Sequence, residues 1–304
     1  MTKQLKAEKF TWINIINPTQ KDISRLKQEF GFHELNLEDC LSNIQRPKVD
    51  VQSNYLFIVL HFPRYFKKLK RMMSEEIDIF LGKDFMITLH SGNLKPLTKF
   101  YEEMQRDPDT QEELTKNGSA MILYELISYL FEYCFPILDK ISERLNNIDT
   151  EMFGQNASFI VPEIAKINQE IISFRKTISP ERRVILDLEE KIKPFLSKGN
   201  ELYFDDITDM AEKIWDNLEN FKEVSESLQR SHDSYVTYKL NEGIKILTVF
   251  SAMLLPLTLI TGYYGMNVKG LPLAENHFSA SIILISMGLL VTLMLYFFKK
   301  KDIL

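Results

Sequence analysis

The alternation of apolar and polar residues changes character along the chain. Up to about His90 it follows the two-residue period of β-strands. Within this part, Thr19 followed by Asp22 has the pattern of a helix N-cap. Together these patterns predict an α/β domain over residues 1–118. Its expected strands are WINII (12–16), NYLFIVLHF (54–62) and the pair within EIDIFLGKDFMITLH (76–90), which turns at Gly82–Lys83–Asp84.

From about Ser119 onward the period of 3.6 residues that is typical of helices replaces the alternation. We therefore expect a helical region over residues 119–200. Its first two helices are predicted at Ala120–Glu151 and Phe159–Ser179. Proline and glycine disturb helices, and the expected disturbances are a kink at Pro136 and breaks at Pro180, Pro194 and Gly199.

Two strongly apolar segments, residues 244–264 and 278–298, are each long enough to cross a bilayer. Residues 265–277 join them, so a transmembrane hairpin is expected. The first span continues a predicted stalk helix, residues 201–243, with Gly243 as the one helix breaker there. About 50 helical residues would extend ~75 Å, which exceeds twice the hydrocarbon thickness of a bilayer. The stalk must therefore project well beyond the membrane.

Lysines after the second span indicate on which side of the membrane the two termini lie. Lys299, Lys300 and Lys301 open the tail, residues 299–304, directly after the second span. The positive-inside rule then puts both termini in the cytoplasm and only the loop outside. Apart from tyrosines, the ionisable residues of 244–298 are Lys245, Lys269, Glu275 and His277.

Composition narrows the function classes. A net charge of −5 argues against a nucleic-acid partner. The N-terminal MTKQLKAEKFTW lacks the apolar core of a signal peptide, so we expect the soluble part to stay in the cytoplasm. Cys40 and Cys134 are expected to be buried free thiols. The five histidines are scattered, and the sequence has no P-loop and no HExxH motif, so we do not expect an enzyme.

Steps of four and three residues trace one face of the stalk and first span. This face, called the polar stripe below, consists of Arg230, Ser234, Thr237, Asn241, Ile244, Thr248, Ser251, Leu255, Thr258 and Gly262. Small and hydroxylated residues allow membrane helices to pack closely, a role that needs no ion. Alternatively, several copies of the helix surround an axis, and the stripe lines a water-filled path. Rings of Ile244, Leu247 and Leu255 would then gate this path by dewetting.

The first span ends in TGYYGMN (261–267), which resembles the signature of the CorA family of divalent-cation channels. The hallmark of that family is Gly-Met-Asn after the first span, here Gly265, Met266 and Asn267. The flanking LNEGIKILTVFSAMLLPLTLI (240–260) is also similar. In the N-terminal half, WINIINPT, HELNLEDCLSNIQRPKVD, NYLFIVLHF and IDIFLGKDFMITLH look like the cytoplasmic domain of the family, so the resemblance covers essentially the whole chain.

This resemblance implies an α+β membrane protein that forms a funnel-shaped homopentamer, with Asn267 in a ring at the outer mouth. Mg²⁺ holds its waters tightly, so amide oxygens of Asn267 and carbonyls near Gly265 would accept hydrogen bonds from those waters and avoid the cost of dehydration. Tyr263 and Tyr264 are expected at the headgroup level. Met266 is expected to pack, since thioethers prefer soft metals.

The sequence departs from the pattern of magnesium channels at two places that bear on which cation is transported. Lys269 lies where those channels have an acidic loop, and VKGLPLAENHF (268–278) also resembles the ZntB branch, which is associated with zinc uptake. Arg230 stands where an aspartate often lines the lower pore, and a ring of arginines opposes cations unless it turns outward or pairs with Asp233. Zn²⁺ is therefore the alternative substrate, although the spans contain no histidine or cysteine for a tetrahedral zinc site.

The resemblance further implies that intracellular Mg²⁺ bridges carboxylates of neighbouring subunits and holds the pore closed. YFDDITDMAEKIWDNLENF (203–221) aligns with the stalk segment that carries these acids, which places Asp206 on the sensor aspartate and Asp209 one turn later. The partner acid is expected from the α/β domain, as Glu75 or Glu76. The alternative is that these are ordinary solvated acids.

Together these features predict Mg²⁺ influx, with Co²⁺ or Ni²⁺ as further substrates, across the cytoplasmic membrane. The expected partners are the lipid bilayer, divalent cations and other copies of the chain. Zinc uptake of the ZntB type, coupled to protons or not, is the first alternative. The second is a membrane-anchored sensory or structural oligomer that transports nothing.

Overall fold

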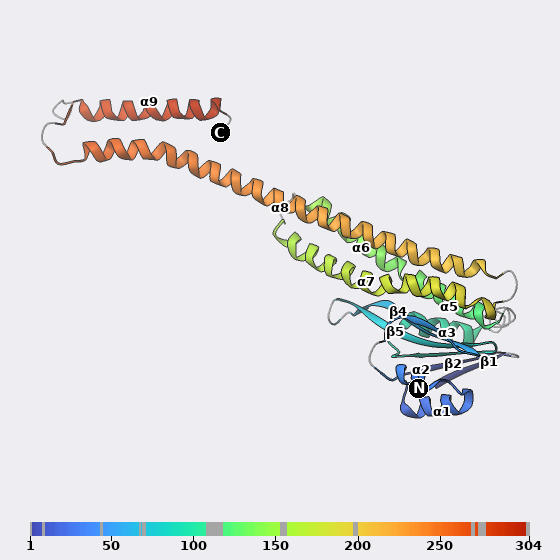
Figure 1. The fold of residues 1–304 in the computed structure, drawn as a ribbon. Coiled ribbons are helices and arrows are strands. Elements are labelled where there is room, and N and C mark those ends of the chain that lie inside the picture. Colours follow the sequence, from blue (N-terminus) through green and yellow to red (C-terminus); the bar gives the residue numbers. More distant parts are fainter. Residues whose placement is uncertain are drawn as a thin grey trace. The chain divides into compact units, whose positions relative to one another are not determined.

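The computed structural model describes residues 2–7, 10–42, 45–66, 68, 71–107, 118–152, 157–196, 200–268, 271–272 and 278–301. Contacts divide the chain into two units, Met1–Gln229 and Arg230–Leu304. The first unit holds a β-sheet with helices on both faces (Figure 1). The second consists of the remainder of one long helix and a last helix.

Six strands form the sheet, in the order β1-β2-β6-β5-β4-β3. Only β2 and β6 pair in parallel, and the other neighbours are antiparallel. The expected strands at 12–16, 54–62 and 76–90 are confirmed, as is the turn at 82–84, whereas β1 and β3 were not predicted. The bounds are β1 Thr2–Ala7, β2 Phe10–Ile16, β3 Lys48–Val51, β4 Tyr55–Phe66, β5 Arg71–Gly82 and β6 Phe85–His90.

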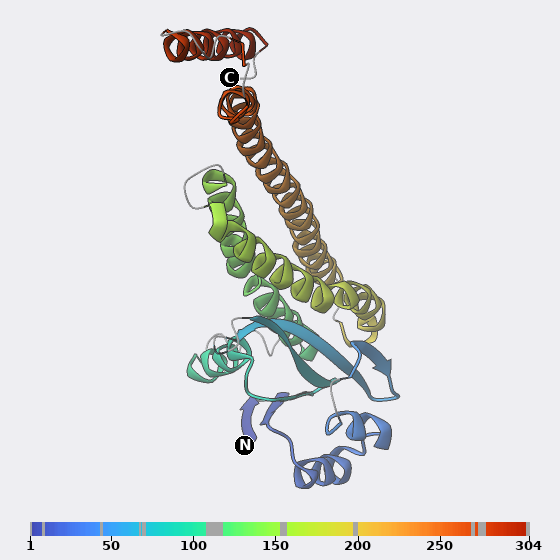
Figure 2. The ribbon, with the colours of Figure 1, turned by 90° about the vertical axis from the view of Figure 1, so that its left-hand side faces the viewer.

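Both faces of the sheet are buried, which explains the nearly unbroken apolar run of β4. Phe57 and Val59 pack with the helices α1 (Gln20–Phe30) and α2 (Glu34–Asp39) on one face. Leu56 and Ile58 face the other helices. Figure 2 shows α1 and α2 on one side of the sheet and the longer helices on the other.

The N-cap predicted for the first helix is confirmed. Thr19 and Asp22 form a capping box, in which the Thr19 side chain accepts a hydrogen bond from the Asp22 N–H and the Asp22 carboxylate accepts one from the Thr19 N–H. These bonds satisfy N–H groups that a helix start otherwise leaves unpaired. The capped helix presents Ile23 and Leu26 to the sheet.

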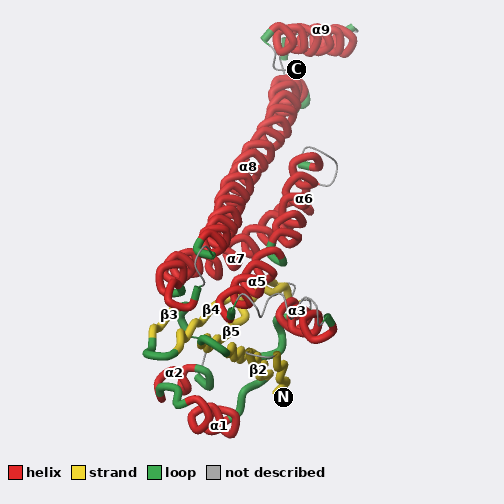
Figure 3. Tube along the Cα trace, turned by 90° about the vertical axis from the view of Figure 1, so that its right-hand side faces the viewer, coloured by secondary structure: helices red, strands yellow, loops and turns green. Residues whose placement is uncertain are grey.

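The second helical layer is built from α3 (Lys95–Arg106), α5 (Ser119–Glu132), α6 (Phe135–Glu151), α7 (Ala157–Lys191) and the first part of α8 (Leu202–Tyr264). A short 3-10 helix, Lys193–Phe195, follows α7. Figure 3 shows these helices on the side of the sheet opposite α1 and α2.

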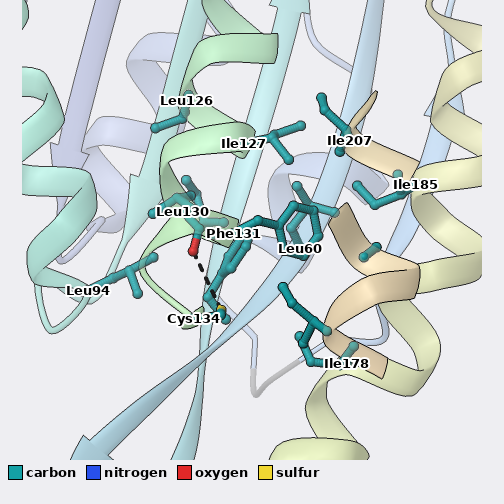
Figure 4. Close-up of a cluster of buried hydrophobic side chains, with 14 of the residues drawn as sticks. Leu60, Leu94, Leu126, Ile127, Leu130, Phe131, Cys134, Ile178, Ile185 and Ile207 are labelled. Carbon is teal, nitrogen blue, oxygen red and sulfur yellow. Dashed lines mark hydrogen bonds between the residues drawn. The ribbon is translucent and has the colours of Figure 1, made fainter. Parts of the chain in front are cut away.

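The core between the sheet and this layer is made of aliphatic and aromatic side chains. In Figure 4, Phe131 of α5 lies among Leu60 of β4, Ile178 of α7 and Ile207 of α8. The thiol of Cys134 donates to the Leu130 carbonyl over 3.5 Å. Both cysteines are buried and free, as predicted.

The prolines act differently from the prediction. Pro136 does not kink one helix, because the helix ends and α6 begins with Pro136 in its first turn, where proline costs no hydrogen bond. Pro180 does not end its helix, since both Pro162 and Pro180 lie inside α7, which has 35 residues in all and ends at Lys191. The apolar face of α7 stays buried on both sides of Pro180, at Ile178 and Ile185, and this burial offsets the lost backbone hydrogen bond. Gly199 lies outside the described residues.

A buried carboxyl group joins α7 to the sheet. The pairing of β3 with β4 ends at Lys48 and Val59, so the edge of β4 beyond that pair has no β3 partner. There the His61 N–H donates to Glu181 Oε1 of α7 over 2.7 Å. Glu181 is completely buried, and this burial raises its pKa well above its usual value. Burial thus favours the neutral form of this carboxyl group.

The long helix α8 has 63 residues, and α9 spans Ser279–Lys300. Three helical stretches of the described residues are long and apolar enough to cross a membrane, namely Ser119–Glu151, which comprises α5 and α6, then α8, and Ala280–Lys300. In the first, 56% of the apolar window is buried within the chain, against 6% in α8 and 0% in the last. The first is therefore part of the core, and the other two offer exposed apolar surface to lipid or to other copies.

Candidate cation path and regulatory acids

The Gly265–Met266–Asn267 segment lies where α8 ends. The Gly265 N–H donates to the Thr261 carbonyl over 2.8 Å, which closes the last helical turn. Asn267 follows outside the helix and is exposed. Its amide is thus held just beyond the end of the first apolar span. The rings of Tyr263 and Tyr264 meet edge to face at this end, with centroids 5.4 Å apart.

Gly265 fits this turn because it has no side chain. A Cβ atom added there would lie 2.9 Å from the Thr261 carbonyl oxygen, closer than real Cβ contacts. By contrast, the same atom at Gly262 or Gly288 would meet nothing within 4 Å. The glycine therefore allows the backbone to leave the helix immediately before Asn267.

The polar stripe of α8 is exposed along its whole length from Ser234 to Gly262 in the single chain. Several of its hydroxyl groups donate to the carbonyl four residues earlier: Ser234 to Arg230 (3.0 Å), Thr237 to Asp233 (2.9 Å), Thr248 to Ile244 (2.8 Å) and Thr258 to Leu254 (2.8 Å). Because each hydroxyl hydrogen is bound to the helix itself, the oxygen is left to act as an acceptor. These hydroxyl groups of the stripe therefore present acceptors rather than donors.

Apolar side chains interrupt these acceptors. Ile244, Leu247 and Leu255 are 60%, 67% and 71% exposed in the single chain. Apolar side chains of this size at membrane depth need cover, from lipid or from other protein. The amide of Asn241 lies one turn before Ile244 and is exposed too.

The structure describes some, but not all, of the other residues that were singled out near the two apolar segments. Arg230 is exposed, whereas His232 is buried to 6% exposure. Lys269, Glu275 and His277 lie outside the described residues, and so does most of the loop after Val268. The tail lysines Lys299 and Lys300 form the last turn of α9.

The predicted regulatory acids of the stalk lie in the first turns of α8. Asp206 and Asp209 are both exposed. The hydroxyl group of Tyr124 in α5 donates to Asp206 Oδ2 over 3.2 Å. One oxygen of Asp206 thus has a partner within the chain, and the carboxylate as a whole is open to solvent. An exposed carboxylate is a suitable oxygen ligand for Mg²⁺.

The two candidate partner acids are neighbours on β5 and point to opposite faces of the sheet. Glu75 is buried and bound by the Arg64 guanidinium at 2.6 Å, and the Ser91 hydroxyl group donates to it over 2.7 Å. Glu76 accepts from the Gln45 N–H over 2.5 Å and lies 3.2 Å from the His61 ring. Arg64 was not singled out from the sequence, since nothing local in the sequence pairs it with Glu75.

Neither of these glutamates meets Asp206 among the described contacts, and the described residues contain no group of three or more histidine, cysteine or acidic side chains arranged to hold a metal. Asp78 lies near Glu76 on the same face of β5, where burial, followed by the charge of Glu76, raises the pKa of Asp78 to about 8. Asp78 is thus mostly protonated at neutral pH.

Comparison with known proteins assigns the chain to a family. Residues 7–300 match the family of CorA-like Mg²⁺ transporter proteins. The cobalt/magnesium transport protein CorA of Thermotoga maritima is 32% identical over 96% of this chain and 82% of its own length. The complete CorA magnesium transporter of Methanocaldococcus jannaschii shares the fold, with a TM-score of 0.83 at 20% identity over 97% of this chain and 92% of that one.

The fold of the first unit also occurs outside the magnesium transporters. The cytoplasmic domain of ZntB from Vibrio parahaemolyticus matches 76% of this chain and 90% of its own, with a TM-score of 0.63 and 14% identity. At that identity the likeness concerns the fold alone. Taken with the match over nearly the full length and the relative from Thermotoga maritima, the geometry of α8 and α9 identifies the chain as a member of the CorA family of metal-ion transporters.

Proposed function

We propose that the protein carries divalent cations across the cytoplasmic membrane, with Mg²⁺ as the main substrate and Co²⁺ or Ni²⁺ as further ones. The observation that carries the proposal is the row of acceptor oxygens on α8, which leads to the exposed amide of Asn267. A hydrated cation presents the hydrogens of its waters. Acceptor oxygens can bind these hydrogens without stripping the waters, which Mg²⁺ gives up reluctantly.

The path requires several copies of α8. One hairpin cannot cover the polar stripe from lipid, and a homopentamer would enclose it around an axis. In this arrangement Ile244, Leu247 and Leu255 form apolar rings. Lysines at the end of α9 support a topology with both termini in the cytoplasm.

Native mass spectrometry of the purified protein is expected to show pentamers, because the exposed stripe and spans need partners. A population of monomers and dimers alone would contradict the pentamer. It would also remove the enclosed path on which the transport proposal depends.

Uptake into protein-containing liposomes tests the function itself. Mg²⁺, Co²⁺, Ni²⁺ and Zn²⁺ should be compared with and without a pH gradient. We expect Mg²⁺ entry that does not depend on the gradient. Zinc uptake that rises with the gradient would favour the ZntB-type alternative. Assembled protein that passes no cation would indicate a membrane-anchored oligomer instead.

Replacement of Gly265 by alanine is expected to lower Mg²⁺ uptake several-fold, because the new Cβ would lie 2.9 Å from the Thr261 oxygen and move the chain that carries Asn267. The matched control is Gly288→Ala in α9, where the added atom meets nothing within 4 Å. Liposome flux of both variants, at equal pentamer content, measures the effect. Equal flux in the two variants would show that the turn at Gly265 does not position the mouth.

Replacement of Asp206 by alanine is expected to weaken the inhibition of flux by internal Mg²⁺. If Asp206 shares an ion with an acid of the next subunit, then Mg²⁺ neutralises a negative pair and favours the closed state. A ligand shifts an equilibrium only through its different affinities for the two states. The variant should also lose Mg²⁺-dependent protection of the first unit from protease.

Asp216→Ala is the matched control, since Asp216 is another exposed aspartate of α8. It should keep both the inhibition and the protection. Should Mg²⁺ inhibit and protect the Asp206 variant as well as the parent, Asp206 has no sensor role. If the Asp206 variant does lose the inhibition, Glu75→Gln and Glu76→Gln show which of the two acids is the partner. Glu75→Gln also removes the charge that pairs with Arg64.

A further inference from the structure

A candidate ligand site lies within the first unit. A cavity of about 690 Å³ opens between the far ends of β4 and β5, the starts of α3 and α6, and the middle of α7. This volume is typical of pockets for small organic ligands. Neither the polar stripe nor the acids at the start of α8 contribute to it.

The charged residues that line the cavity are mostly cations: Arg64, Lys68, Lys95, Lys140 and Arg144, against the single acid Glu170. Two of the cations are already paired, Arg64 with Glu75 at 2.6 Å and Arg144 with Glu170 at 2.7 Å. Lys95 and Lys140 are exposed and have no acidic partner among the described residues. The pocket thus keeps positive charge although the whole chain has a net charge of −5.

Two helix starts add to this positive potential. The cavity is lined by Leu94, Lys95 and Pro96 at the start of α3, and by Tyr133, Pro136 and Ile137 at the start of α6. Neither helix has a side chain that caps its N-terminus. The positive ends of both helix dipoles are therefore not offset by a capping side chain. These helix ends add to the positive potential from the lysines, and they do not by themselves define the site.

The rest of the lining is apolar and aromatic. Tyr65, Phe66, Ile137 and Ile141 provide surface for an organic group beside the cations. The Arg64 guanidinium lies 5.0 Å from the centre of the Phe66 ring, so a cation and an aromatic surface already lie together in this lining. A lone inorganic anion would use only part of this surface.

We propose that this cavity binds an organic polyphosphate of the nucleoside triphosphate class. The phosphates contact Lys95, Lys140 and the positive helix ends, and the base lies against the apolar lining. The pairing of Arg144 with Glu170 fixes one wall: burial raises the pKa of the Glu170 carboxyl, and the guanidinium beside it holds the pair in place. The site is independent of the cation path, so it stands or falls separately from the transport proposal.

Isothermal titration of the full-length protein in detergent tests the site, with ATP, tripolyphosphate and adenosine as probes. EDTA is present throughout, so that no probe binds through Mg²⁺ at the acids of α8. We expect saturable binding of ATP at one site per subunit, weaker binding of tripolyphosphate and no binding of adenosine. In the double variant K95Q/K140Q the affinity for ATP should fall at least about tenfold, since two charge-assisted contacts are lost.

The control K21Q/K176Q removes the same charge from exposed lysines of α1 and α7 that do not line the cavity, and it should bind ATP like the parent. Three results would overturn the proposal: no saturable ATP binding, equal loss of affinity in both double variants, or no loss in K95Q/K140Q. If tripolyphosphate binds as tightly as ATP, the proposed contact between the base and the apolar lining is refuted. If acidic side chains of a neighbouring subunit fill the cavity, ATP cannot enter it, and the titration would show no saturable ATP binding.

Discussion

Substitution of Asn267 by alanine is expected to abolish or sharply reduce Mg²⁺ uptake while leaving assembly intact. The side chain is exposed at the end of α8, so its removal creates no cavity in a core. On the proposed path, the substitution removes an amide oxygen that would accept hydrogen bonds from the waters of the entering ion. A hydrogen bond to a charged group contributes about 1.5–3 kcal/mol, and losing that stabilisation slows passage by about ten- to a hundredfold.

Liposome flux, with native mass spectrometry to confirm equal assembly, measures this effect. Asn220→Ala makes the same chemical change at an exposed asparagine of α8 within the first unit, and it should transport like the parent. Normal flux through an assembled Asn267→Ala variant would exclude the amide from the path. It would leave backbone carbonyls near Gly265 as the remaining ligands for the hydrated ion.

Replacement of Glu181 by glutamine is expected to stabilise the first unit at neutral pH, although it removes an acid from the centre of the fold. Burial raises the pKa of Glu181 well above its ordinary value of 4.5. The unfolded chain therefore releases a proton above pH 4.5 that the folded chain keeps. Stability is fully present below that pH and falls as the pH rises, by up to about 1.4 kcal/mol per unit.

Glutamine keeps the acceptor for the His61 N–H and never ionises, so the thermal midpoint of the variant should exceed that of the parent increasingly between pH 5 and pH 8. Intrinsic fluorescence can follow this, because Trp12 and Trp215 both lie in the first unit. Glu143→Gln on the exposed side of α6 is the matched control and should show no such trend. A difference between variant and parent that does not change with pH would show that the folded Glu181 has an ordinary pKa.

The sequence allowed the strands with two buried faces to be predicted, because their apolar runs are long. β4 and β5 have 12 residues each and read clearly as strands. The edge strands β1 and β3 were missed for a physical reason. Among the described side chains of TKQLKA only Leu5 is buried, and the four-residue KVDV buries Val49, so neither shows an apolar period.

The prolines show where local rules fail. A proline in a helix interior costs ~3 kcal/mol relative to alanine, which favoured a break at Pro180. Burial of Ile178, Ile185 and their neighbours outweighs that cost, and no local pattern reveals it. At Pro136 the opposite occurs, because a helix start tolerates proline at no cost.

The candidate sites differ in whether their residues are near one another in the sequence or only in the folded chain. Gly265 to Asn267 and the stripe of α8 are contiguous or periodic, so the sequence sufficed to propose them. The cavity of the first unit is assembled from Arg64, Lys95, Lys140 and Arg144, which come from three different elements, β4, α3 and α6. The ion pair of Glu75 with Arg64 joins residues of β4 and β5. Only the tertiary fold brings such residues together.

The unbroken course of α8 limits how this chain can vary in length. Each residue inserted into a helix turns everything beyond it by about 100°. A single insertion between Gln229 and Gly243 would therefore rotate the hydroxyl-bearing face of the later part of α8 relative to the earlier part, with every individual side chain unchanged. Insertions or deletions of about seven or eleven residues nearly restore the phase. Within α8, length is thus constrained as strictly as residue identity, and small changes of length belong in the loops instead.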